Sequence, residues 1–116
     1  MVQNRNKLID LFIGNVSNSI VHKILEMAID NEEMCNRYEK ELITSFEIAK
    51  RYREKINPTN IPFPDKDIIY IKSKIKNKVK AELLIRISKG YKNINLELID
   101  EMIDDYLNEM NVAWKY

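Results

Sequence analysis

The chain has 116 residues, of which 45% are hydrophobic and 32% are charged, with a formal net charge of +1. This length suits a single domain, and this composition is typical of a folded protein rather than a disordered one. The small net charge gives no case for binding to nucleic acid or to a membrane. With only 2 glycines and 3 prolines, a β-rich fold is disfavoured, because its tight turns need these residues. We therefore expect one all-α domain spanning residues 1–116.

The single cysteine, Cys35, has no internal partner for a disulfide, which suits a reducing compartment. Near the N-terminus, Asp10, Asn15 and Asn18 interrupt the apolar residues. The sequence therefore shows neither the core of a signal peptide nor the roughly 20 apolar residues of a membrane span. These features predict a cytoplasmic protein that does not enter a membrane.

The first predicted helix runs from about Asn6 to Ile29, where apolar residues recur at steps of three and four. Gly14 lies within it and leaves open a kink or a break. Further apolar residues widen the stripe, so this helix is expected between two neighbours, or between one neighbour and a second chain. The residues predicted to form an interface, with a protein partner or with a second copy, are Leu8, Leu11, Val21 and Leu25.

The second helix is predicted to begin at a capping box, Asp30 to Glu33, and to end near Ile56. In such a box the two side chains each bond the other residue's amide. The prolines that follow remove backbone donors and end the helix. Ile61 and Phe63 lie among these prolines, and we expect them to anchor the linker to the core.

The third helix is expected to begin with Asp65 as its N-cap and to end near Lys89, with Gly90 as the left-handed residue after it. Asn95 is the expected cap of the fourth helix, whose apolar face extends to Trp114. The predicted fold is therefore a four-helix bundle made of two helical hairpins, joined by a proline-rich crossover loop.

Basic residues concentrate on the third helix and acidic residues on the fourth. The alternating lysines between positions 72 and 80 lie on both flanks of the apolar stripe. Three interpretations remain open: lysine stems that cover the edge of the core, pairing with the acidic helix of the same or a second chain, and contact with phosphates or another anionic surface. The candidate anion or nucleic-acid contacts are Lys72, Lys76, Lys80, Arg86 and Lys89.

No residues offer a nucleophile with its base, or a metal with its ligands. His22 is the one histidine, and it is expected to be exposed and without the partner that a general base needs. Cys35 is expected in the core as a small apolar residue. The acidic helix lacks the histidines found in di-metal bundles. We therefore predict no catalytic residue, no metal and no cofactor.

The stretches Asn36–Tyr38 and Ile48–Arg53 resemble the helical arm of the archaeal ribonuclease P zinc-ribbon subunit, although the ribbon's cysteine pairs are absent. The chain is also similar in size and helix content to HEPN-type ribonuclease bundles, without their arginine–histidine motif, and to the small helical subunits of CRISPR complexes. No function is transferred from these resemblances. The expected function is that of a non-enzymatic interaction or assembly protein that self-associates or binds a protein partner. The alternative is a nucleic-acid-associated accessory protein that uses the basic third helix.

Overall fold

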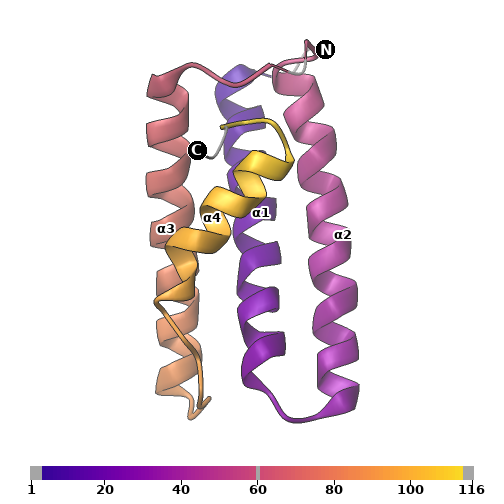
Figure 1. Cartoon of the computed structure of the whole chain (residues 1–116), viewed down its shortest axis with the longest axis vertical. Helices are drawn as coiled ribbons and strands as arrows, with labels where there is room; N and C mark the ends of the chain where they lie inside the picture. Colours follow the sequence, from indigo (N-terminus) through magenta and orange to yellow (C-terminus); the bar gives the residue numbers. More distant parts are fainter. Residues whose placement is uncertain (1–3, 60, 114–116) are drawn as a thin grey trace.

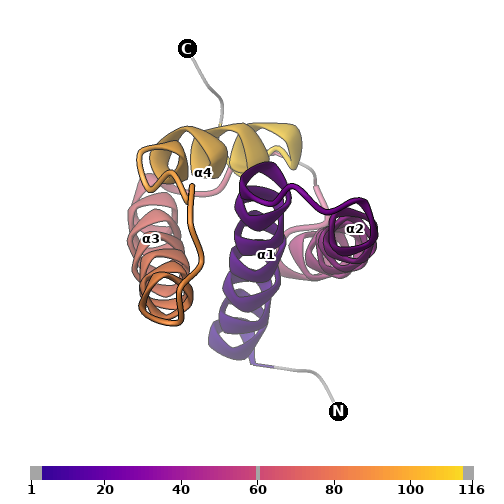
Figure 2. The same cartoon turned by 90° about the horizontal axis from the view of Figure 1, so that it is seen from below.

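The computed structural model describes residues 4–59 and 61–113, and all regular secondary structure within these ranges is α-helical. The helices are α1 (Arg5–Ala28), α2 (Glu32–Ile56), α3 (Asp65–Ser88) and α4 (Leu98–Glu109). The three long helices run alongside one another, and the short α4 crosses α1 and α3 obliquely (Figure 1, Figure 2). The prediction of an all-α fold is confirmed for the described residues.

Helix α1 lies at the centre of the bundle and contacts each of the other three helices (Figure 2). Asn4 caps its N-terminus, because the side-chain oxygen accepts a hydrogen bond from the Asn6 amide at 2.8 Å. The helix continues through Gly14, where an added methyl group would meet nothing within 4 Å. The break left open at this glycine does not occur. The central position of α1 explains why apolar residues occupy so much of its circumference.

Helices α1 and α2 form an antiparallel hairpin (Figure 1). Asn31 is the N-cap of α2, and its side-chain oxygen accepts a hydrogen bond from the Met34 amide at 3.0 Å. The predicted capping box beginning at Asp30 is therefore wrong by one residue. Asparagine and aspartate cap helices about equally well, so the sequence pattern does not separate them. Across the hairpin, the Ser19 hydroxyl donates to the carbonyl oxygen of Leu42 at 2.9 Å.

Arg53, near the end of α2, is only 3% exposed, and backbone carbonyl oxygens are its hydrogen-bond partners. Its guanidinium donates to Asn57 and Ile61 in the linker, and to Met110 and Asn111 after α4, at 2.6 to 3.0 Å. Burial lowers the pKa of this guanidinium. One side chain thus connects the end of α2, the linker and the end of α4.

The linker between α2 and α3 passes the N-terminal end of α1 (Figure 1). Phe63 anchors it as predicted: the ring is 3% exposed and lies 4.7 Å from the Arg53 guanidinium. The Phe63 amide also donates to the carbonyl oxygen of Val112 at 2.9 Å. The same prediction is wrong for Ile61, whose side chain is 57% exposed. Only the backbone carbonyl of Ile61 contributes to the anchor, through Arg53.

Helix α3 begins at Asp65, with Pro64 in the N-cap position and no side-chain hydrogen bond there, so the prediction that Asp65 is the cap is wrong by one residue. The predicted C-terminus is confirmed. Gly90 has a φ of +98°, and its amide and the next one donate to the carbonyl oxygens of Ile87 and Arg86 at 3.0 and 3.1 Å. This is a Schellman motif, which needs a residue with positive φ and therefore favours glycine.

Helix α4 is 12 residues long and begins at Leu98. Asn95 does not cap it; its side chain accepts a hydrogen bond from the Glu97 amide at 3.0 Å, within the turn that precedes the helix. Because α4 runs diagonally over α1 and α3 (Figure 1), the predicted pairing of α3 and α4 in a second hairpin is not confirmed. Trp114 lies outside the described residues. The buried residues of α4 are Ile99, Ile103 and Leu107.

The core is a single cluster of side chains to which all four helices contribute. Helix α1 supplies the largest share because it has a neighbour on three sides. Each fully buried leucine, isoleucine or phenylalanine contributes about 1.5–3 kcal/mol relative to its exposed state. The largest side chains with almost no exposure include Phe12, Ile20, Ile24, Ile71, Ile75, Leu83 and Leu107.

Candidate functional site

Two ion pairs join the basic helix α3 to the acidic helix α4. Lys72 lies 3.0 Å from Asp104, and Lys76 lies 3.1 Å from Asp100. Both pairs are about half exposed, so each contributes only about 0–1 kcal/mol. Of the three interpretations of these lysines, the positions of Lys72 and Lys76 correspond to pairing with the acidic helix of the same chain. The two carboxylates reduce the positive potential that Lys72 and Lys76 offer to an outside anion.

The other candidate anion contacts do not join these lysines in one row. Lys80 and Lys89 are exposed, whereas Arg86 is half-buried and lies 3.3 Å from Glu82 in the groove between α1 and α3. Burial opposes the charge of Arg86, but hydrogen bonds with Tyr91 and Glu82 outweigh it, and the pKa of the guanidinium rises. The structure therefore separates the predicted set into paired, exposed and groove-lining groups.

The predicted interface on α1 is covered by the chain itself. Leu8, Val21 and Leu25 are buried, with exposed fractions of 7%, 4% and 1%, and Leu11 is half-buried. The expectation that these four residues meet a partner rested on the width of the apolar stripe. That width is accounted for by α2, α3 and α4, which all contact α1. These leucines and this valine therefore leave little surface for a second molecule.

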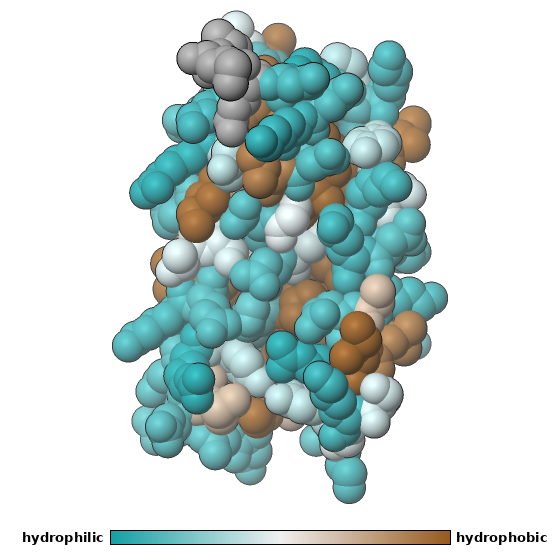
Figure 3. Space-filling view, turned by 180° about the vertical axis from the view of Figure 1, so that it is seen from behind, coloured by the Kyte–Doolittle hydropathy of each residue, from teal (hydrophilic) through white to brown (hydrophobic). Residues whose placement is uncertain are grey.

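The exposed large apolar side chains gather instead on α3. Ile69 is 69% exposed, Leu84 is 46% and Ile87 is 39%. Ile87 is exposed although it follows the buried Leu83 by four residues. Figure 3 shows the side of the molecule opposite α4, where an apolar patch at the lower right lies over the C-terminal half of α3, which carries the exposed Leu84 and Ile85.

We define the α3 outer face by exposed residues that follow one another at helical steps of three and four. Apolar side chains occupy its two ends and small or uncharged side chains its middle. Lys74 and Lys78 flank it on one side and Lys80 on the other. The sequence did contain a signal for this face: α3 has large apolar residues outside its buried row of Ile71, Ile75, Val79 and Leu83. No interface was predicted there from the sequence. The α3 outer face consists of Ile69, Tyr70, Ser73, Asn77, Ala81, Leu84, Ile85 and Ile87.

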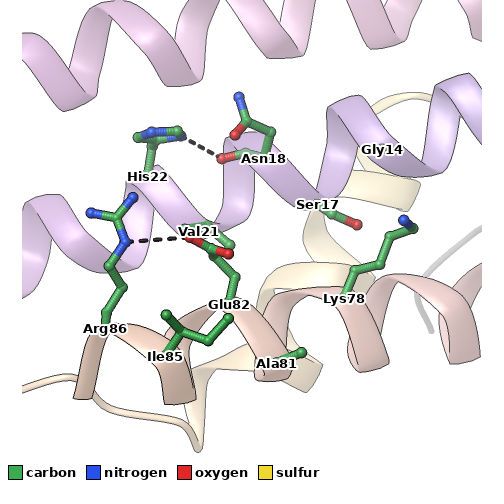
Figure 4. A pocket seen from close by; sticks show the side chains of 10 residues that line it. All are labelled: Gly14, Ser17, Asn18, Val21, His22, Lys78, Ala81, Glu82, Ile85 and Arg86. Atoms are coloured by element: carbon green, nitrogen blue, oxygen red, sulfur yellow. Dashed lines mark hydrogen bonds and ion pairs between the residues drawn. The ribbon is translucent and has the colours of Figure 1, made fainter. Parts of the chain in front are cut away.

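A groove of about 470 Å³ separates α1 from α3 beside this face. Figure 4 shows that Gly14, Ser17 and Val21 line it from α1, and that Lys78 and Glu82 line it from α3. The Ser17 hydroxyl is buried and has no hydrogen-bond partner among the described residues. The polar groups of the groove include one exposed lysine and one ion pair already formed, so they define no single ligand.

His22 was expected to be exposed, but it is only 8% exposed. Its Nδ1 lies 2.7 Å from the carbonyl oxygen of Asn18, and its Nε2 contacts the carboxylate of Glu41 on α2. Its ring centroid lies 5.7 Å from that of Tyr38. Both ring nitrogens are engaged, one by a backbone carbonyl of α1 and the other by a carboxylate of α2. His22 therefore connects α1 to α2.

Cys35 is half-buried rather than a core residue, and its thiol lies 3.5 Å from the carbonyl oxygens of Glu26 and Ile29. It packs against the end of α1 at the turn into α2. Within the part of the chain that the structure describes, no group of three or more histidine, cysteine, aspartate or glutamate residues is placed to hold a metal ion.

The fold and its surface define a class: an all-α bundle with an exposed apolar face flanked by lysines. The chain matches no protein-family model, no curated protein and no solved structure. Within residues 4–59 and 61–113, no helix is both long enough and apolar enough to cross a membrane. The exposed side chains of this chain are therefore the basis for a functional proposal.

Proposed function

We propose that this is a non-enzymatic helical interaction protein of the cytoplasm that binds a protein, either another molecule or a second copy, through the α3 outer face. The observation that carries the proposal is the exposure of Ile69, Tyr70, Leu84, Ile85 and Ile87 along a single helix. Scattered apolar residues are normal on a surface, whereas several on one helix face are typical of an interaction site.

The composition of the face supports the same proposal. Its apolar side chains would lose their contact with water on docking, which is the main source of affinity at most interfaces. Ser73, Asn77 and Ala81 in the middle are small enough for a close approach of a partner helix. The flanking Lys74, Lys78 and Lys80 would orient an acidic partner during the encounter.

The alternative proposal is a nucleic-acid-associated accessory protein that uses the lysines of α3. The exposed side chains of Lys78, Lys80 and Lys89 favour it. It has less support, because Lys72 and Lys76 lie against carboxylates of α4 and the remaining cations do not form one phosphate track.

The test replaces two apolar residues of the face, Leu84→Gln and Ile87→Gln, in one variant. The control is Ile43→Gln, which changes an isoleucine of α2 that is 50% exposed. We expect the immobilised wild-type chain and the control to retain the same binding partners from an extract, its own copies included. The double variant should lose at least about tenfold in retention, as expected when apolar residues that carry much of the contact are replaced. Equal retention by all three proteins would contradict the proposal.

A further inference from the structure

The chain carries a second charged surface, on the side of α4 that faces away from the core. We define the α4 outer row as Glu97, Glu101 and Glu109, which are exposed and lie four or eight residues apart. Carboxylates at this spacing repel one another unless cations lie nearby. The intramolecular pairs with α3 use other acidic residues of this helix, Asp100 and Asp104.

The lysines that flank the α3 outer face can form ion pairs with a partner. Lys78 and Lys80 are exposed and form no ion pair within the described residues. Lys74 lies over the ring of Tyr70, 5.7 Å from its centroid, and its ammonium stays exposed to water. The α3 outer face is therefore apolar at its two ends and basic along its flanks.

Charge decides between two ways of pairing copies of this chain. If two α3 helices packed antiparallel about a twofold axis near Asn77, Lys74 of one copy would lie opposite Lys80 of the other. Like charges placed opposite one another oppose association. The α4 outer row offers carboxylates instead, with the half-buried Leu98 beside it as an apolar contact.

We infer that the partner of the α3 outer face is a second copy of this chain, which docks through its α4 outer row. The inference rests on the proposed function, because it takes the α3 outer face as the interaction surface. The two intramolecular pairs, at 3.0 and 3.1 Å, show that lysines of α3 and carboxylates of α4 meet when these helices lie side by side.

This contact uses two different surfaces, so it is heterologous. Each added copy leaves one α3 outer face and one α4 outer row uncovered, and the assembly grows until it closes as a ring or continues as a filament. The near-neutral net charge of +1 favours such growth, because assembled copies repel one another little.

The experiment uses two charge-reversal variants of the full chain. One carries Lys78→Glu and Lys80→Glu on α3, and the other carries Glu97→Lys and Glu101→Lys on α4. The matched control carries Glu33→Lys and Glu39→Lys, two exposed residues of α2, the first of them near a helix N-terminus as Glu97 is. Sedimentation velocity at rising protein concentration measures association, and circular dichroism checks that each variant remains helical.

We expect the wild type and the control to associate at low ionic strength and to associate more weakly at about 0.5 M salt, where charges are screened within a few ångströms. Each reversal variant alone should associate at least about tenfold more weakly, because like charges then meet. An equimolar mixture of the two variants should regain association, since opposite charges meet again across the contact.

A mixture that stays as dissociated as its two components would overturn the inference, and so would a monomeric wild type at low salt. If the Leu84→Gln/Ile87→Gln variant still lost its extract partners in that case, the α3 outer face would bind a different protein. The proposed function would then stand without this inference. If that variant also behaved as wild type, both would fail.

Discussion

Arg53 shows how a single buried cation can hold a fold together without a carboxylate. Its guanidinium donates to carbonyl oxygens of Asn57, Ile61, Met110 and Asn111, and it lies 4.7 Å from the centroid of the Phe63 ring. Arginine suits this place because it offers five donors in a fixed plane. The sequence has no signal for this role, because nothing in a helical pattern relates position 53 to positions 110 and 111.

Replacing this side chain tests its role directly. We expect Arg53→Met to lower the free energy of unfolding by about 3 kcal/mol or more, because buried carbonyl oxygens lose their donors. The control is Arg51→Met, an exposed neighbour on α2, which should change stability by no more than about 0.5 kcal/mol. Urea denaturation followed by circular dichroism gives both values. Equal denaturation midpoints for the two variants would show that the Arg53 contacts do not stabilise the fold.

His22 shows why exposure could not be predicted from one helix. It lies away from the apolar stripe of α1, which indicated a solvated side chain, yet Glu41 and Tyr38 of α2 cover it. The periodicity of a sequence identifies the most buried face of a helix. It does not say how many neighbours the helix has, and α1 has three.

At the scale of the helices, local signals in the sequence located the ends well but often missed the capping residue by one position. Asn31 caps α2 instead of Asp30, and α3 starts at Asp65 instead of after it. Adjacent residues with similar side chains compete for the cap, and the preference for either is small. Glycine at position 90 was predictable because positive φ has a strong residue preference.

The two glycines predict opposite responses to the same substitution. Gly14→Ala should stabilise the protein by about 0.5–1 kcal/mol, because alanine is the better helix former, and an added methyl group meets nothing within 4 Å. Gly90→Ala should destabilise it by about 1 kcal/mol, because alanine strains a backbone at positive φ. Thermal unfolding of the two variants measures both effects. A shift of the melting temperature in the same direction for both would contradict this prediction.

At the scale of the whole molecule, the arrangement of charges gives more support to the proposed protein-binding role than to the nucleic-acid alternative. The lysines nearest α4 are occupied by Asp100 and Asp104. Those that remain lie on two flanks of α3 rather than in one row. A phosphate backbone needs several cations on one path, and each contact adds to the salt dependence of binding.

We therefore expect no salt-dependent binding of a short duplex or single-stranded oligonucleotide at micromolar protein concentration. Changing Lys72, Lys76 and Lys80 together to alanine should leave this result unchanged. Fluorescence anisotropy of a labelled oligonucleotide at low salt provides the measurement, with a lysine-rich peptide as the positive control. Binding by the wild type that falls steeply with salt and disappears in the triple variant would favour the nucleic-acid alternative instead.

The sequence by itself determined the helices: their number among the described residues, their approximate ends, and the segregation of bases to α3 and acids to α4. These follow from hydrophobic periodicity, glycine and proline, which act over a few residues. Only the tertiary structure decided which apolar residues are covered. It buried Leu8, Val21 and Leu25 under three neighbouring helices and left Leu84 and Ile87 exposed, because burial depends on contacts between segments far apart in the chain.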